Sequence, residues 1–148
     1  TRIIRTINID PALLSVYPEI RLGCLHFHRR SKSIFGRIWD YLDHEILPCG
    51  KKLISKENEW SEVTGVRGSR AAYKAFGRNP GRYRVSSEAL LRRVRRGDEL
   101  YHVNSVVDEN NLISVESGLS VGSYDLEQLQ GDIVFRKAEA SQVEVWNL

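Results

Sequence analysis

Three polar side chains recur at helical spacing in the otherwise apolar stretch from Asn104 to Glu116. Asn104, Asp108 and Asn111 are four and three residues apart, which places them on one face of a helix. Amide and carboxylate groups on a buried face must be hydrogen-bonded. They could fasten the helix to a neighbouring loop or line a pocket for a small molecule, and the sequence leaves both uses open.

The next stretch, Gly-Leu-Ser-Val-Gly at residues 118–122, matches the G-x-S-x-G turn of serine hydrolases. That chemistry needs a strand before the serine, a helix after it and a histidine later in the chain. All the histidines come before Ser120; they are His26, His28, His44 and His102. We therefore interpret the stretch as a glycine-rich loop.

Cys24, His26 and His28 alternate along a predicted strand and are residue types that bind zinc. A second group of ligands at a suitable spacing is missing from the sequence. We interpret the three residues as one partly buried strand face, and we expect neither a metal nor another cofactor.

Positive charge is concentrated between Gly65 and Gly97, a segment called the basic window below. It holds ten Lys or Arg residues and one acid, Glu88, so its net charge is +9, whereas the whole chain carries +3. One-sided charge of this kind is typical of a protein that contacts phosphates, and RNA is the first candidate partner. The cations predicted to contact RNA are Arg67, Arg70, Lys74, Arg78, Arg82, Arg92, Arg93, Arg95 and Arg96.

The alternative is that these cations form a solvated face and pair with acids elsewhere, such as Asp98 or Asp108. Tyr73, Phe76 and Tyr83 lie among the charges and offer stacking surfaces for bases.

Helices are expected to position these residues. Hydrophobic spacing predicts one helix from Glu62 to Phe76 and a second that Ser86 caps and Gly97 ends. A turn at residues 77–81 separates them. A third helix, buried and apolar nearly all round, is predicted from Asn104 to Glu116.

Strands and further helices complete the predicted fold. Alternation predicts strands at 3–9 and 20–28 and a strand-rich end that starts at 133–135 and runs to Trp146. A short helix is predicted at 10–15, a long one at 33–46 and another at 51–60. The expected class is α+β, with helices packed on a mixed or antiparallel sheet in a single domain over residues 1–148.

Composition excludes some classes of protein. Because no run of about 18 apolar residues occurs, we expect no membrane span, and the N-terminal residues do not resemble a signal peptide. The two cysteines, Cys24 and Cys49, do not form a disulfide framework, so a reducing, cytoplasmic location is predicted.

Six short motifs follow one another in an order that resembles a known family. They are Tyr73-Lys-Ala-Phe-Gly77, Pro80-x-x-Tyr83-Arg, Ser86-Ser-Glu-Ala-Leu-Leu-Arg-Arg93, Asn104-x-x-Val107-Asp108-x-x-Asn111, Val121-Gly122-x-Tyr124-Asp125 and Gly131-Asp132-Ile133. The series is similar to the tRNA-binding and editing module of the phenylalanyl-tRNA synthetase β subunit, and most of all to its free-standing relatives. The similarity is dense from about Val63 to Ala138.

The resemblance implies an α+β module that binds tRNA and hydrolyses mischarged aminoacyl-tRNA, such as tyrosine on phenylalanine tRNA. It implies no covalent nucleophile, because the family's pocket orients a water and the terminal ribose. The residues implied to line the pocket are Asn104, Asp108, Asn110, Asn111, Ser120, Gly122 and Tyr124.

Two departures from the family pattern bear on catalysis. Gly122 stands where bacterial synthetases carry a histidine, although free-standing relatives also tend to have glycine there. The family continues beyond the position of Leu148 through a strand-rich section that closes the pocket, and this chain is expected to lack it. Three functions therefore stay open: deacylation in trans, RNA binding without catalysis, and binding of an amino-acid-like small molecule.

Overall fold

The computed structural model describes residues 6–27, 44–45, 48 and 62–139. The helices predicted at 33–46 and 51–60 lie almost entirely outside these residues, as does the predicted strand-rich end from 140 to Trp146. The chain divides into two compact units. The terminal unit combines residues 1–25 with 124–148, and the helical unit comprises residues 26–123.

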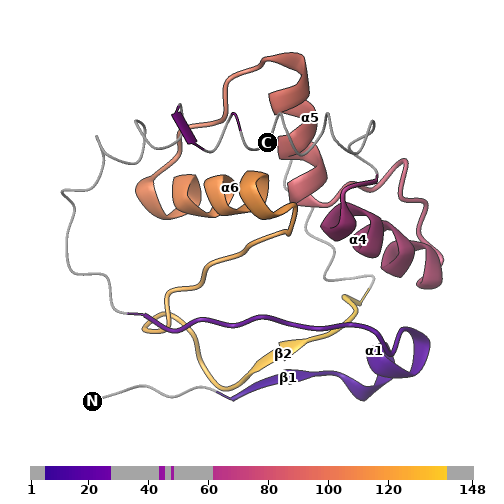
Figure 1. The fold of residues 1–148 in the computed structure, drawn as a ribbon. Helices are drawn as coiled ribbons and strands as arrows, with labels where there is room; N and C mark the ends of the chain where they lie inside the picture. The colour runs from indigo at the N-terminus through magenta and orange to yellow at the C-terminus, as the bar shows by residue number, and fades with distance from the viewer. Residues whose placement is uncertain (1–5, 28–43, 46–47, 49–61, 140–148) are drawn as a thin grey trace. The chain divides into compact units, whose positions relative to one another are not determined.

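The terminal unit contains a two-stranded parallel sheet made from distant parts of the sequence (Figure 1). Strand β1 (Ile7–Ile9) pairs with β2 (Ile133–Phe135), and Ile7 lies opposite Ile133. The described pair is parallel, which excludes a purely antiparallel sheet and is compatible with the mixed sheet that was the other prediction. Parallel neighbours need a long crossover, and here the sequence of the whole helical unit separates the two strands.

Helix α1 (Pro11–Val16) follows β1 and confirms the short helix predicted at 10–15. Asp10 caps it, since Oδ1 of Asp10 accepts a hydrogen bond from the backbone N–H of Ala12 at 2.9 Å. Pro11 occupies the first helical position, where no intrahelical N–H bond is lost. Leu13 is the buried side chain of this helix.

The predicted strand at 20–28 is wrong over its described part, because residues 20–27 adopt no regular structure. The side chains from Arg21 to Phe27 are exposed, and Leu25 retains 92% of its accessible surface. Alternation of residue types is not sufficient for a strand, since the backbone also needs a partner strand for its hydrogen bonds.

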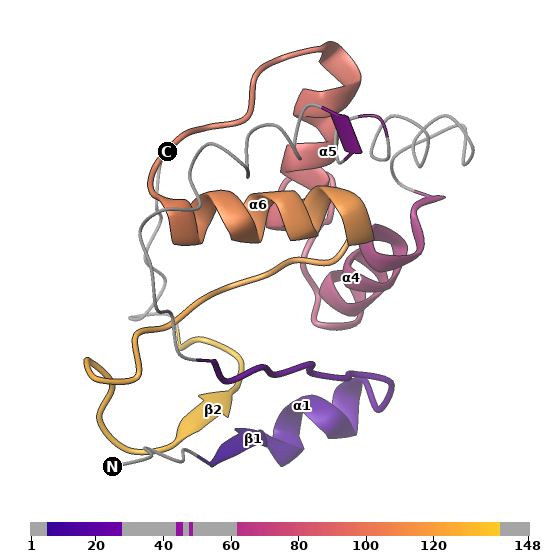
Figure 2. The ribbon, with the colours of Figure 1, turned by 60° about the vertical axis from the view of Figure 1, so that its left-hand side comes forward.

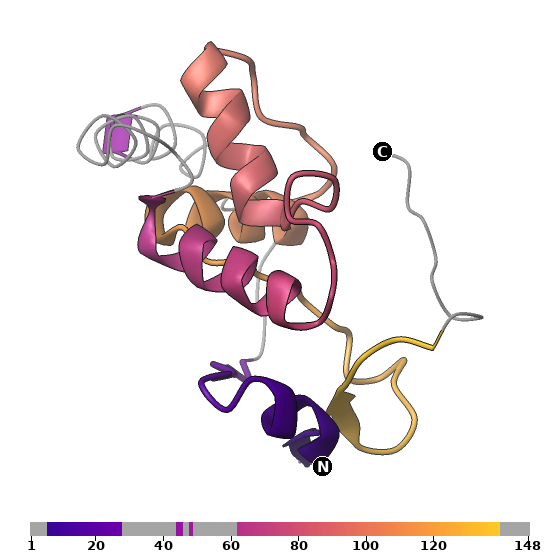
Figure 3. The ribbon, with the colours of Figure 1, turned by 90° about the vertical axis from the view of Figure 1, so that its right-hand side faces the viewer.

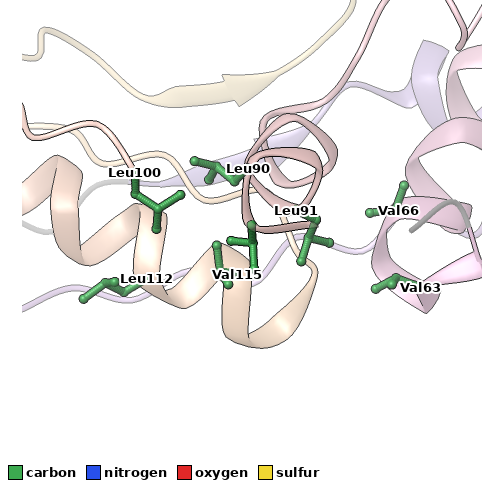
Figure 4. Packing of buried hydrophobic residues seen from close by; sticks show 8 residues of the cluster. Val63, Val66, Leu90, Leu91, Leu100, Leu112 and Val115 are labelled. Carbon is green, nitrogen blue, oxygen red and sulfur yellow. The ribbon is translucent and has the colours of Figure 1, made fainter. Parts of the chain in front are cut away.

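The helical unit contains α4 (Thr64–Ala75), α5 (Ser86–Arg96) and α6 (Ser105–Ser117), as the sequence predicted within a residue or two. Helix α5 crosses α6 rather than running alongside it, and α4 lies beside the start of α5 and the end of α6 (Figures 2 and 3). Their buried apolar side chains form one core (Figure 4), consisting of Val63, Val66, Leu90, Leu91, Val94, Leu100, Leu112 and Val115.

Local signals explain where these helices end. Gly97 and Gly118 adopt the left-handed conformation, with φ of +79° and +73°, and terminate α5 and α6. Two local predictions need correction. Ser86 does not cap α5, because the N-cap position is Val85 and makes no side-chain cap bond. Helix α6 is not buried all round either, since Ile113 is 49% exposed.

The end of α6 approaches the first turn of α4 closely. A Cβ atom added to Gly65 would lie 2.5 Å from the carbonyl oxygen of Gly118 and 2.9 Å from Cδ2 of Leu119. No side chain larger than that of glycine fits at Gly65 without a shift of backbone. Glycine at this position lets α4 and the loop after α6 come together.

Candidate functional site

A buried carboxylate lies inside the basic window. Glu88 is 1% exposed, and its carboxylate accepts hydrogen bonds from Nη1 of Arg70 at 3.1 and 3.2 Å. Arg92, one turn further along α5, places its Nε 3.3 Å from the same carboxylate. A buried charge needs compensation of this kind, so two of the predicted RNA-binding arginines balance Glu88.

Two more of these arginines are held by the chain that follows α5. Arg93 donates from Nε to the carbonyl oxygen of Glu99 at 2.9 Å, and its guanidinium lies 4.0 Å from the centroid of the Tyr101 ring. Arg96 forms an exposed ion pair with Asp98 at 2.9 Å. The pairing expected with Asp98 is present, whereas Asp108 accepts a backbone hydrogen bond instead.

The remaining cations of the predicted set are exposed, and within the described residues none of them forms an ion pair with an acid. They are Arg67, Lys74, Arg78, Arg82 and Arg95. Arg84 is a further exposed cation on the same turn as Arg82. Helix α4, the turn after it and the end of α5 thus present positive charge to solvent.

The turn between α4 and α5 surrounds one aromatic ring with cations. The guanidinium carbons of Arg78 and Arg82 lie 5.1 and 5.7 Å from the centroid of the Tyr83 ring, within the range of a cation–π interaction. The ring itself is 41% exposed. Cationic and aromatic groups therefore occur together at the surface of this turn.

Two of the polar residues predicted to line a pocket instead fix the start of α6. Oδ1 of Asn104 accepts hydrogen bonds from the N–H groups of Val106 and Val107 at 3.0 Å each, as an N-cap residue does. Asp108 is 3% exposed and accepts from the N–H of Val103 at 3.1 Å. These contacts fasten the helix to the preceding loop, which is one of the two uses that the sequence left open.

Asn110 and Ser123 bring the middle of α6 together with the loop that follows it. The Ser123 hydroxyl donates to Oδ1 of Asn110 at 2.8 Å. The neighbouring Asn111 is half-buried, and Gly122, the residue before Ser123, is exposed. An amide, a hydroxyl and an open glycine are therefore adjacent, and such groups can bind a polar ligand or a water.

Ser120 contacts the start of α5. Its Oγ accepts a hydrogen bond from the N–H of Ser87 at 3.3 Å and lies 3.1 Å from the Ser87 hydroxyl. It therefore supplies from another part of the chain the cap that Val85 cannot give α5. Helix α6 precedes Ser120 and irregular chain follows it, so the strand–turn–helix context of a nucleophile elbow is absent from these residues.

Two further sequence-based predictions fall elsewhere in the chain. Tyr124 opens the second segment of the terminal unit, where its side chain is 71% exposed. Cys24 and His26 lie on the exposed stretch after α1, and His28 is outside the described residues. In the described part of the chain, no three His, Cys, Asp or Glu side chains gather as a metal site would require. None of the helices described there is long and apolar enough to cross a membrane.

Several residues that shape this region were not singled out from the sequence. Ser87 is fully buried against Ser120, Tyr101 holds Arg93, and Ser123 holds Asn110. The sequence contains no local signal for these contacts, because they join residues that are far apart in the sequence or that lie in a loop, whereas Glu88 and Arg92 have the four-residue spacing of a helical ion pair.

One comparison with known proteins gives a match. A family model described as the B3/4 domain matches residues 68–145, which is more than half of the chain. The matched segment runs from within α4 to beyond β2. No curated protein and no solved structure matches the chain.

Proposed function

Because this chain belongs to the B3/4 domain family, a family of the phenylalanyl-tRNA synthetase β-subunit type, we propose that it is a domain that binds tRNA. The exposed cations of the helical unit carry the proposal. Arg67, Lys74 and Arg95 make no contact with an acid in the described chain and remain available for phosphates. Arginines whose charge is already balanced by Glu88 or Asp98 should contribute less to tRNA binding.

A salt titration with matched variants tests this function. Binding of a tRNA through several phosphates weakens steeply with salt, because each contact adds about 0.9 to the negative log–log slope. Replacing Arg67 and Lys74 together with serine should lower the affinity and make that slope shallower by about one to two. The matched control replaces Arg21 and Lys137, two exposed cations of the terminal unit, with serine and should change neither quantity.

Equal losses from both double variants would contradict a surface on the helical unit. Absence of tRNA affinity in the unaltered protein would reject the function altogether and favour an amino-acid-like small ligand. Binding without turnover would identify a non-catalytic RNA-binding domain.

Deacylation of mischarged tRNA in trans is the second candidate function. The contact between Asn110 and Ser123, beside Asn111 and the open Gly122, supports it by offering polar groups that could hold a water near an ester. Water would add to the ester carbonyl, and the amino acid would leave as the ribose hydroxyl recovers a proton. The departure at Gly122 means that no histidine at that position assists the step.

The assay measures ester loss from tyrosyl-tRNA(Phe) and from other mischarged tRNAs. We expect the unaltered protein to accelerate hydrolysis of at least one of them and Asn110→Ala to lose most of that acceleration. Gln130→Ala, at an exposed position in the terminal unit, is the control and should retain full activity. Unchanged rates with every mischarged tRNA would reject hydrolysis but leave tRNA binding untouched.

A further inference from the structure

Tyr83 combines exposure with a fixed position. Its backbone N–H donates to the carbonyl oxygen of Asn79 at 3.0 Å, and Oδ1 of Asn79 accepts from the N–H of Gly81 at 2.8 Å. These bonds close a tight turn around Pro80. The ring projects from a turn with defined internal hydrogen bonds, rather than from a segment without them.

The same turn is fastened to the interior of the helical unit. Nη1 of Arg70 donates to the carbonyl oxygen of Pro80 at 3.2 Å while it also binds the buried carboxylate of Glu88. Any group that binds at Tyr83 therefore meets a preorganised surface and loses little conformational entropy by ordering it.

The surroundings of the ring favour a nucleotide over other polyanions. Arg78 and Arg82 place their guanidinium groups over the ring, and Arg84 is another exposed cation, next to Tyr83 in sequence. A nucleotide has a flat base that can stack on the ring and a phosphate that can bind a guanidinium, whereas an acidic peptide has only the charge. Bases inside a duplex are already stacked on one another, so an unpaired base is the better fit.

We propose that Tyr83 is a stacking site for an unpaired base of RNA, with Arg78 and Arg82 on the adjoining phosphates. The proposal rests on the RNA-binding function above and adds to it a preference for single-stranded segments. It also assigns to one residue a contribution that does not depend on charge.

Binding of fluorescent oligonucleotides, followed by anisotropy, tests the proposal. The probes are a single-stranded oligouridylate and an RNA duplex of equal length, at one fixed salt concentration. Tyr83→Ala should weaken binding of the single strand by roughly 5- to 150-fold, the usual range for one stacked base, and change duplex binding less than about twofold. Tyr83→Phe keeps the aromatic face and should bind both probes as the unaltered protein does.

Tyr101→Ala is the matched control, since Tyr101 is also an exposed ring beside an arginine. Nη1 of Arg93 donates a hydrogen bond to the Tyr101 hydroxyl. Removing the Tyr101 ring should therefore leave the affinities for the single strand and for the duplex unchanged. Tyr83→Leu retains apolar volume at the turn and should weaken single-strand binding as Tyr83→Ala does. An equal loss in both variants would show that the weaker binding comes from the missing ring and not from unfolding.

Four results would overturn the proposal. Equal binding of the single strand by Tyr83→Ala and the unaltered protein would reject stacking while leaving the RNA-binding function intact. A loss in Tyr83→Phe as large as that in Tyr83→Ala would assign the effect to the hydroxyl instead. Polyglutamate of equal charge could displace the oligonucleotide equally well from Tyr83→Ala and from the unaltered protein. That result would show that the surface binds any polyanion. If the unaltered protein binds neither RNA probe, both the stacking site and the RNA-binding function fail.

Discussion

At the scale of single residues, the net charge of the basic window is larger than the positive charge that is exposed to solvent without an acid partner. Arg70 and Arg92 are largely committed to Glu88, and Arg96 to Asp98. The cations without an acid partner among the described residues lie mainly on α4 and on the turn that carries Tyr83. The available positive surface is therefore smaller and more localised than the basic window.

The Glu88 carboxylate should contribute far more to stability than the exposed pair at Asp98. Glu88→Gln leaves two guanidinium groups beside a buried amide, so we expect it to lower the free energy of unfolding by about 2–3 kcal/mol. Asp98→Asn removes a partner from a solvent-exposed pair and should cost less than about 1 kcal/mol. Urea unfolding followed by circular dichroism measures both values, and a similar cost for the two variants would contradict a structural role for Glu88.

The contacts of the candidate site were predictable only where they are local in sequence. Asn104 caps N–H groups two and three residues away, and Glu88 lies four residues before Arg92, so both contacts are local, although neither was predicted. Arg70 and Glu88 are 18 residues apart, and Ser87 and Ser120 are 33 apart. Such pairs depend on how α4, α5 and the loop after α6 pack, which no local pattern specifies.

At the scale of elements, the loop after α6 joins three helices. Gly118 terminates α6, its carbonyl lies against Gly65 at the start of α4, and Ser120 caps the start of α5. The negative end of one helix dipole therefore lies near the positive ends of two others, which is a favourable arrangement. Two residues of the G-x-S-x-G pattern thus have structural roles, Gly118 as the end of α6 and Ser120 as a cap of α5.

Two glycines on α4 should respond in opposite ways to alanine. In Gly65→Ala the new methyl group meets the backbone of Gly118, and we expect a loss of about 1–3 kcal/mol of stability. In Gly68→Ala nothing lies within 4 Å, so the better helix propensity of alanine should stabilise the protein by about 0.5–1 kcal/mol. Thermal or urea unfolding of the two variants measures both changes in stability. An unchanged stability in Gly65→Ala would show that the loop after α6 can move away from α4.

Helices were easier to predict than strands for a physical reason. A helix satisfies its backbone within one segment, so the hydrophobic spacing and Gly97 were sufficient to place α4, α5 and α6 within a residue or two. A strand needs a partner, and the partner of β1 lies at the other end of the chain. The sequence could show that Ile7–Ile9 and Ile133–Phe135 favour strands, but it could not show that they pair in parallel.

At the scale of the whole molecule, the two units differ in how much they bury. The helical unit buries a continuous apolar core contributed by α4, α5, α6 and adjoining residues. In the described part of the terminal unit, Leu13 is the buried apolar side chain, while Ile7, Val134 and Phe135 on the sheet are 41–50% exposed. A sheet of two strands with so little burial is marginal by itself.

Hydrogen exchange should therefore separate the units. We expect backbone amides in α5 and α6, such as those of Leu91 and Val115, to exchange most slowly, and those of Ile133 and Asp10 in the sheet to exchange through local opening. Mass spectrometry or NMR in deuterated buffer can measure the rates. Equal protection in the two units would indicate that they open as one cooperative body.

The parallel pairing of β1 and β2 also has a consequence for synthesis on the ribosome. About 125 residues separate Ile7 from its partner Ile133. At a translation rate of roughly 5–20 residues per second, β1 is synthesised about 6 to 25 seconds before β2. The residues of the helical unit emerge during that interval and are contiguous in sequence. Nascent chains should thus acquire their helices first and complete the sheet last, and a chaperone that shields isolated strands would act on the N-terminal segment.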